Sequence, residues 1–137
     1  MRFVDTNIFI RYLTKDDPVK AENCYRLFKE AEKNQIDLTT SESVIAEVVF
    51  ILSSKRLYHL SREEVQARLY PLISLQGLKI PHRRMYLRAL DLYANNTIDF
   101  EDALSIAIME RQGIDGIISY DRDFDRVKDV EITRTEA

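Results

Sequence analysis

The chain has 137 residues, is 45% apolar and 31% charged, and contains only 3 Gly and 3 Pro. This composition excludes a disordered chain and a collagen-like repeat, and the length suits one self-sufficient domain over residues 1–137. The formal net charge of −3 argues against a protein that holds nucleic acid through bulk positive charge.

Neither a membrane helix nor a leader is expected. No stretch approaches the ~18 consecutive apolar residues of a membrane span, and the N-terminus enters a strand pattern directly, without a signal peptide. We therefore expect a cytoplasmic protein with no membrane partner. Cys24 shares a helical stripe with Ala21, Phe28 and Ala31, and we interpret it as a small core residue.

Short strand patterns alternate with longer helical patterns along the chain. In order, we expect a strand at 2–4, helices at 8–13 and 18–34, a strand at 36–39, helices at 41–53 and 62–74, a strand at 78–80, helices at 83–95 and 99–112, and strands at 116–119 and 131–133. The alternation predicts the α/β class, as a three-layer α/β/α sandwich with a mostly parallel sheet of about four to five strands.

Capping residues set several helix boundaries. Thr6 and Asn7 can cap the first helix, and Ser61 with Glu64 has the spacing of a capping box. Gly113 stands where helices usually end in a left-handed residue.

Four carboxylates are predicted to meet at the carboxyl edge of the sheet, where functional groups gather in folds of this class. Asp5 directly follows the first strand, and Asp121 follows the fourth strand by two residues. Glu47 lies in the helix that begins where the second strand ends, and Asp102 lies in the first turn of the helix that leads into the fourth strand. For Asp99, at the start of that same helix, we favour simple capping.

Glu47 interrupts an apolar run, with residues 44–46 before it and 48–52 after it. We expect this run to be largely buried. Because an unpaired buried charge is costly, Glu47 would then need a cation, a proton or a metal ion nearby.

The acidic set favours a hard divalent cation. Converging carboxylates repel one another unless they are protonated or bridged, and oxygen-only ligands suit Mg²⁺ or Mn²⁺. Zinc is disfavoured because His59 and His82 lie outside these motifs, as surface or loop residues. Bound cations would also attract phosphates, which reconciles the acidic composition with a nucleic-acid substrate.

The motifs that carry these acids resemble a known family. They are FVDTN at 3–7, SVIAEVV at 43–49, DAL at 102–104 and SYDRDF at 119–124. In order and spacing the set resembles the PIN-domain ribonucleases over nearly the whole chain, and a short chain of this kind is most similar to the VapC toxins of prokaryotic toxin–antitoxin pairs.

The resemblance implies a metal-dependent endoribonuclease that cleaves RNA phosphodiesters with metal-activated water. It assigns the metal to four acids: Asp5, Glu47, Asp102 and Asp121. It also implies hydrogen-bonding support from Thr6, Asn7 and Ser119. Asp123 is then a supporting acid or a loop cap, and it could exchange roles with Asp121.

The resemblance further implies a homodimer and a cognate protein antitoxin that covers the active site. Four cations, Lys55, Arg56, Arg62 and Arg68, could follow an RNA backbone or could be plain surface charge.

Three other functions remain open at this point. A Mg²⁺-dependent phosphatase of the haloacid dehalogenase type also begins with an aspartate after the first strand, but it needs a second acid where this chain has Asn7. A receiver-like signalling domain would need paired acids there and an aspartate after the third strand, which here ends in Ile80, Pro81 and His82. The third is a non-catalytic binding module of the PIN type.

Overall fold

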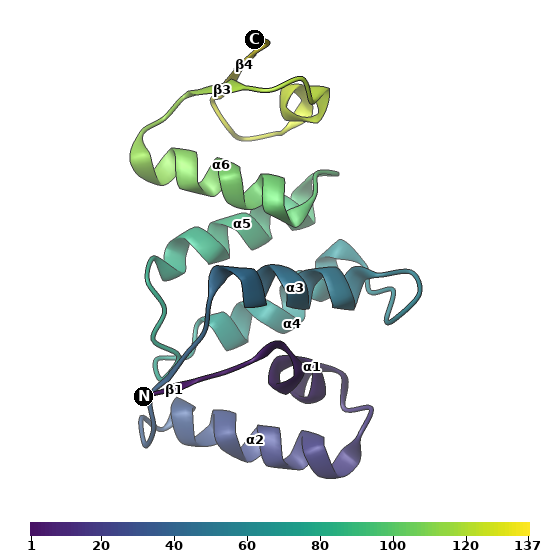
Figure 1. Cartoon of the computed structure of the whole chain (residues 1–137), viewed down its shortest axis with the longest axis vertical. Coiled ribbons are helices and arrows are strands. Elements are labelled where there is room, and N and C mark those ends of the chain that lie inside the picture. The colour runs from purple at the N-terminus through teal and green to yellow at the C-terminus, as the bar shows by residue number, and fades with distance from the viewer. The chain divides into compact units, whose positions relative to one another are not determined.

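The structure is a computed structural model that describes residues 1–137 (Figure 1). The chain divides into two compact units, Met1–Arg83 and Arg84–Ala137. The first unit contains β1 (Arg2–Phe3), α1 (Thr6–Thr14), α2 (Pro18–Glu32), β2 (Leu38–Thr39), α3 (Glu42–Ser53) and α4 (Arg62–Ile73). Nearly all of α5 (Arg83–Asn95) belongs to the second unit, which continues with α6 (Phe100–Gln112), β3 (Gly116–Ile118), the 3₁₀ helix η1 (Arg122–Arg126) and β4 (Thr133–Thr135). The expected single domain stays a prediction.

In the first unit, β1 and β2 pair in parallel, with Phe3 opposite Thr39. The expected strand at 78–80 is reduced to a single parallel bridge between Leu38 and Leu78. The ladder stops there for two reasons. The Lys79 carbonyl accepts a hydrogen bond from the Thr39 side chain, Oγ1, at 2.7 Å, and Pro81 has no N–H to donate to the neighbouring strand.

In the second unit, β3 and β4 pair in parallel from Gly116 opposite Thr133 to Ile118 opposite Thr135. The last strand lies two residues later than the expected 131–133. The α/β class and the parallel pairing are therefore confirmed. The difference lies in the extent of the strands, since two ladders of two and three residues, one in each unit, replace a continuous sheet of four to five strands.

The six expected helices are all present, and their caps explain their ends. Ser61 and Glu64 form the predicted capping box, and Gly113 ends α6 in the left-handed conformation at φ 70°. The first helix begins earlier than expected, because Asp5 rather than Thr6 or Asn7 is its cap. Asp99 occupies the predicted N-cap position of α6, but its side chain makes no capping hydrogen bond.

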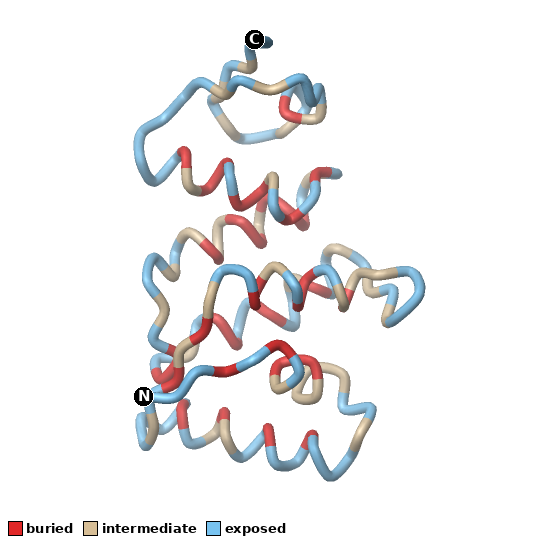
Figure 2. Tube along the Cα trace, in the orientation of Figure 1, coloured by how far each residue is buried: buried red, intermediate tan, exposed pale blue.

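Each unit has its own apolar core, and buried residues recur along one side of its helices (Figure 2). In the first unit, Cys24 is buried as expected, and the ring of Phe28 packs on the rings of Phe9 and Tyr12. In the second unit, Tyr93 is buried edge-on against Phe100. None of the helices is both long and apolar enough to span a bilayer.

The turn before Leu78 depends on a glycine. A Cβ atom added to Gly77 would lie 2.1 Å from the Ala31 carbonyl oxygen of α2, a backbone atom that cannot swing aside. We expect Gly77→Ala to destabilise the protein by roughly 1–3 kcal/mol or more in urea unfolding, as overpacking does. Gly116→Ala is the matched control, since no atom lies within 4 Å of its added Cβ. Equal stability of the two variants would contradict this account.

Candidate active site

A buried threonine joins two of the predicted acids in the first unit. The backbone N–H of Thr6 donates to Asp5 Oδ1 at 2.8 Å, and its hydroxyl Oγ1 donates to Glu47 Oε2 at 2.8 Å. Thr6 is only 5% exposed, whereas Asp5 and Glu47 are exposed. One core residue, through its backbone N–H and its hydroxyl, thus fixes the orientation of two carboxylates at the surface.

The local sequence explains why α1 and α3 meet there. Val4 donates to the Thr39 carbonyl at 2.8 Å, and the buried Thr40 hydroxyl donates to the Val4 carbonyl at 2.8 Å. The chain leaving β1 is therefore tied to the chain leaving β2, directly before the two N-caps, Asp5 and Ser41. Both helices begin at the carboxyl edge of the ladder, as the sequence predicted.

The expected burial of Glu47 is wrong. Helix α3 turns one apolar face inward and leaves Glu47 and Phe50 on its exposed side. Residues three apart on a helix share a face, so an apolar run of this length need not be buried on all sides. The buried residues of α3 are Val44, Ile45, Val48, Val49 and Leu52. Burial therefore gives no reason to expect a cation beside Glu47.

The second unit places Asp102 among other acids. Partial burial raises the pKa of Asp102 above its ordinary value, and the nearby charges of Asp99, Asp121 and Asp123 raise it further. No positive side chain offsets this repulsion, because Asp102 has no ion-pair partner. The start of α6 is therefore an electrostatically strained position that a bound cation would relieve.

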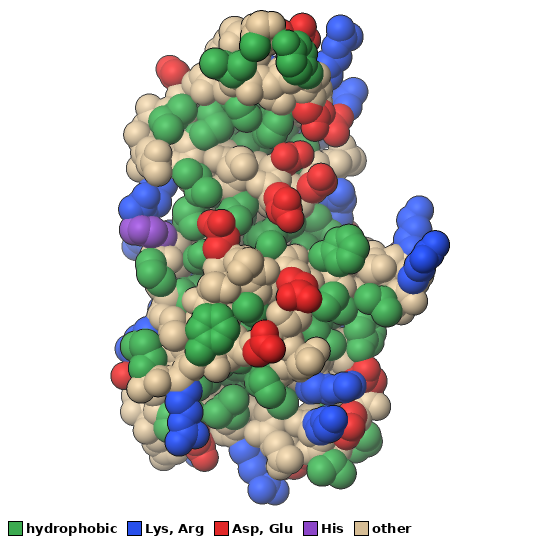
Figure 3. Space-filling model, in the orientation of Figure 1, with side chains coloured by type: hydrophobic (Ala, Val, Ile, Leu, Met, Phe, Trp, Pro, Cys, Tyr) green, Lys and Arg blue, Asp and Glu red, His purple; other side chains and the backbone are tan.

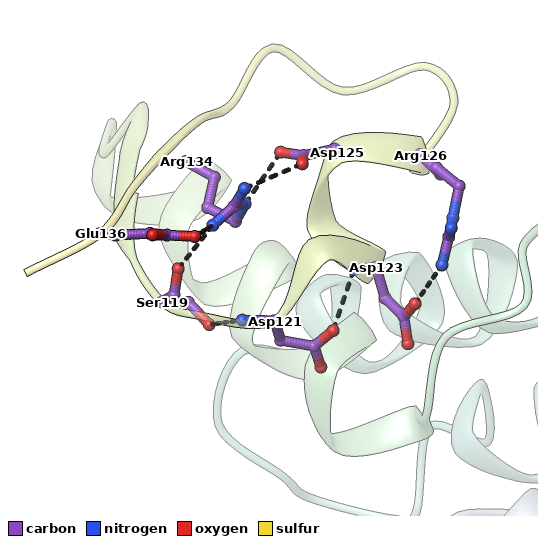
Figure 4. A network of polar contacts seen from close by, with 7 residues as sticks. All are labelled: Ser119, Asp121, Asp123, Asp125, Arg126, Arg134 and Glu136. Carbon is purple, nitrogen blue, oxygen red and sulfur yellow. Dashed lines mark hydrogen bonds and ion pairs between the residues drawn. The ribbon is translucent and has the colours of Figure 1, made fainter.

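The loop after β3 separates the roles of Asp121 and Asp123 (Figure 4). Ser119 Oγ accepts from the Asp121 N–H at 3.0 Å, and Asp121 Oδ1 accepts from the Asp123 N–H at 2.9 Å, which caps η1. The Asp123 carboxylate forms an ion pair with Arg126. Asp123 is thus neutralised within the loop, whereas Asp121 keeps a carboxylate without a cationic partner.

Arg134 of β4 holds this loop in place. Its guanidinium donates to both carboxylate oxygens of Asp125, at 3.0 and 3.1 Å, and to the Ser119 carbonyl at 2.9 Å. The contact keeps the pKa of Asp125 below its usual range. No local sequence pattern predicts this anchor, because its partners lie nine and fifteen residues away along the chain.

The four predicted metal-binding acids share one property. None of Asp5, Glu47, Asp102 and Asp121 forms an ion pair, whereas Asp16, Asp123 and Asp125 each pair with an arginine. The acids divide between the units, two in each, and neither unit by itself gathers three or more His, Cys, Asp or Glu residues into a group that could hold a metal ion. The donors are all carboxylate oxygens, which suits Mg²⁺ or Mn²⁺.

The hydrogen-bonding support predicted from Asn7 is absent. The Asn7 side chain is exposed and makes no hydrogen bond. Both histidines are exposed loop residues with positive φ, as expected for residues outside the site. Two hollows of the first unit, about 620 and 340 Å³ in volume, contain none of the acids in their walls.

The chain matches the PIN domain family over residues 2–130. It belongs to the PIN-domain family. Among curated PIN-like relatives it is similar to a VapC ribonuclease of Aquifex aeolicus (strain VF5), at 23% identity over 127 residues that cover 93% of this chain and 92% of the relative. A solved structure that it matches is the Mycobacterium tuberculosis toxin VapC20, described as cleaving the sarcin–ricin loop, with 24% identity, a TM-score of 0.41, and coverage of 96% of this chain and 98% of that one.

The strain at Asp102 predicts a pH-dependent stability. Because the folded chain raises the pKa of Asp102, the ionised carboxylate lowers stability above that pKa, and the cost vanishes once the pH falls below about 4, where the unfolded side chain is also protonated. In EDTA, Asp102→Asn should therefore melt at a higher temperature than wild type at pH 7 and at the same temperature at pH 3. The exposed Asp115→Asn serves as the control. A lower melting temperature of Asp102→Asn at pH 7 would be the contrary result.

Proposed function

We propose that the protein is a metal-dependent endoribonuclease of the VapC type, which cleaves RNA phosphodiesters and is neutralised by a cognate antitoxin protein. Membership of the PIN-domain family and similarity to a VapC ribonuclease over nearly the full length of both chains support the activity. The observation that carries the proposal is the pair of hydrogen bonds by which Thr6 orients Asp5 and Glu47, two carboxylates without counter-ions. The homodimer and the cytoplasmic location stay predictions.

In this proposal, Asp5, Glu47, Asp102 and Asp121 hold Mg²⁺ or Mn²⁺. The oxygen-only donor set, the missing counter-ions and the raised pKa of Asp102 all support a divalent cation there. A cation so bound supplies an activated water and offsets the charge that develops on the phosphate.

The other residues keep the acids in position. Thr6 restrains one oxygen each of Asp5 and Glu47 and leaves the second oxygen of each free. Ser119 holds the backbone of Asp121, which we assign as the ligand in preference to Asp123, because Asp123 is already paired with Arg126. Asn7 faces solvent beside Asp5, where it can donate to the RNA. Asn7 also counts against the phosphatase alternative, since that chemistry needs an acid at this position.

The first test is cleavage of 5′-labelled tRNA and structured rRNA fragments by the purified, antitoxin-free protein. We expect discrete cuts with Mg²⁺ or Mn²⁺ that disappear in EDTA. Asp5→Asn and Glu47→Gln should each lose about two orders of magnitude or more in rate, as loss of a metal-binding group does. If wild type shows no cleavage with either cation, or if Glu47→Gln cleaves at the wild-type rate, the assignment fails.

A second test isolates the role of Thr6. Thr6→Val removes the donor to Glu47 at similar size, whereas Thr6→Ser keeps it. We expect Thr6→Val to weaken the Mn²⁺-induced rise in melting temperature and to slow cleavage about 10- to 100-fold, as loss of a supporting hydrogen bond does. Thr6→Ser should restore both. A purely structural role would lower the metal-free melting temperature of Thr6→Val and leave the metal response unchanged.

A further inference from the structure

Helix α3 and the loop after it carry an acid, an aromatic ring and two cations in succession. Glu47 is exposed, and Phe50 follows one turn later with 70% of its surface exposed. The helix ends at Ser53, and Lys55 and Arg56 follow in the exposed loop before α4. Figure 3 shows Lys and Arg side chains gathered on this projecting loop, at the right of the view.

The spacing places these groups along one surface. Residues three apart on a helix have Cβ atoms about 5–6 Å apart on the same face, so Phe50 and Glu47 share the exposed face of α3. With a rise of about 1.5 Å per residue, the end of α3 lies roughly 9 Å beyond Glu47. The side chains of Lys55 and Arg56 form no hydrogen bond or ion pair and are therefore available to a ligand.

We propose that Phe50 is a stacking platform for an unpaired base next to the cleaved phosphodiester, and that Lys55 and Arg56 contact the RNA backbone further along the strand. This inference rests on the proposed ribonuclease function and assigns a base-binding residue to that site. Proteins that bind single-stranded nucleic acid commonly combine exposed aromatic rings, on which bases stack, with Lys or Arg side chains that bind the phosphates. A duplex keeps its bases stacked on one another, so only an unpaired base can stack on Phe50.

Charge favours RNA over a protein partner at this position. The centres of protein interfaces are depleted of charged residues, whereas Phe50 stands between Glu47 on one side and Lys55 and Arg56 on the other. A phosphate backbone complements the two cations, and the metal proposed at Glu47 would offset the acid. Phe50 thus positions the nucleotide next to the cleaved bond and takes no part in the chemistry.

The experiment compares kcat/KM for three variants on a hairpin RNA with a single-stranded loop. Loss of one base–aromatic stack should lower the kcat/KM of Phe50→Ala about five- to a hundredfold. Phe50→Trp, which keeps an aromatic face, should retain most of the activity. Leu57→Ala is the matched control, because Leu57 is an exposed aliphatic side chain in the same loop, at 59% exposure, and offers no ring. It should cleave like wild type.

A binding measurement separates this inference from the proposed function. The Asp102→Asn protein is mixed with the same hairpin carrying 2-aminopurine in its loop, and stacking on Phe50 should quench the fluorescence in a way that Phe50→Ala abolishes. If wild type cleaves and Phe50→Ala cleaves equally well, the stacking role is wrong while the ribonuclease stands. If wild type does not cleave, the ribonuclease proposal fails. Quenching that is lost in Phe50→Ala would then still support stacking on Phe50. Quenching that is absent, or that is the same in Phe50→Ala, would overturn the stacking role.

Light scattering tests whether the exposed face of α3 around Phe50 is instead an interface between two copies of the chain. If wild type is a dimer and both Phe50→Ala and Leu57→Ala convert it to monomers, the face is an interface between copies of the chain, and the stacking role is overturned. An oligomeric state that is the same in wild type and both variants supports the assignment to RNA.

Discussion

The arrangement of the first unit depends on how Thr6 uses its two donors. Its amide satisfies the helix cap at Asp5, which any N-terminal residue of α1 could do, but its hydroxyl reaches a carboxylate 41 residues away on α3. Charge-assisted hydrogen bonds of this kind are directional, and Thr6 is locked in the core. Two like charges are thereby kept in fixed orientations without a positive side chain between them. The fold tolerates this repulsion because both carboxylates remain in contact with water.

The second unit manages its negative charge differently. In the loop after Asp121, two carboxylates are each paired with an arginine, Asp123 with Arg126 and Asp125 with Arg134. Asp102 receives no such partner and keeps a raised pKa. Perturbed and unpaired acids are characteristic of functional positions, since a structural acid is normally neutralised by its neighbours. Asp102 is thus distinguished by its raised pKa together with the absence of an ion-pair partner.

The helices and the candidate acids could be predicted from the sequence, because both depend on residues that are close together along the chain. Caps such as Ser61 and turn residues such as Gly113 placed the ends of every helix within two residues, and acids next to strand ends pointed to the candidate site. The misses have tertiary causes. The strand at Leu78 is cut short by a side-chain bond from Thr39, and the exposure of Glu47 and Phe50 depends on which face of α3 meets the core. A uniformly apolar stretch does not reveal that face, and the bond from Thr6 joins residues that no local pattern connects.

The anchoring of the Asp121 loop by Arg134 bears on how the protein is made. When synthesis has reached only η1, all four acids are already present in the chain. Arg134 has not yet been added, so its bidentate contact to Asp125 and its bond to Ser119 cannot form (Figure 4). The loop gains its anchor only after residue 134 has emerged and β4 can pair with β3. The loop around Asp121 is thus set late in synthesis, by a strand that follows it in the chain.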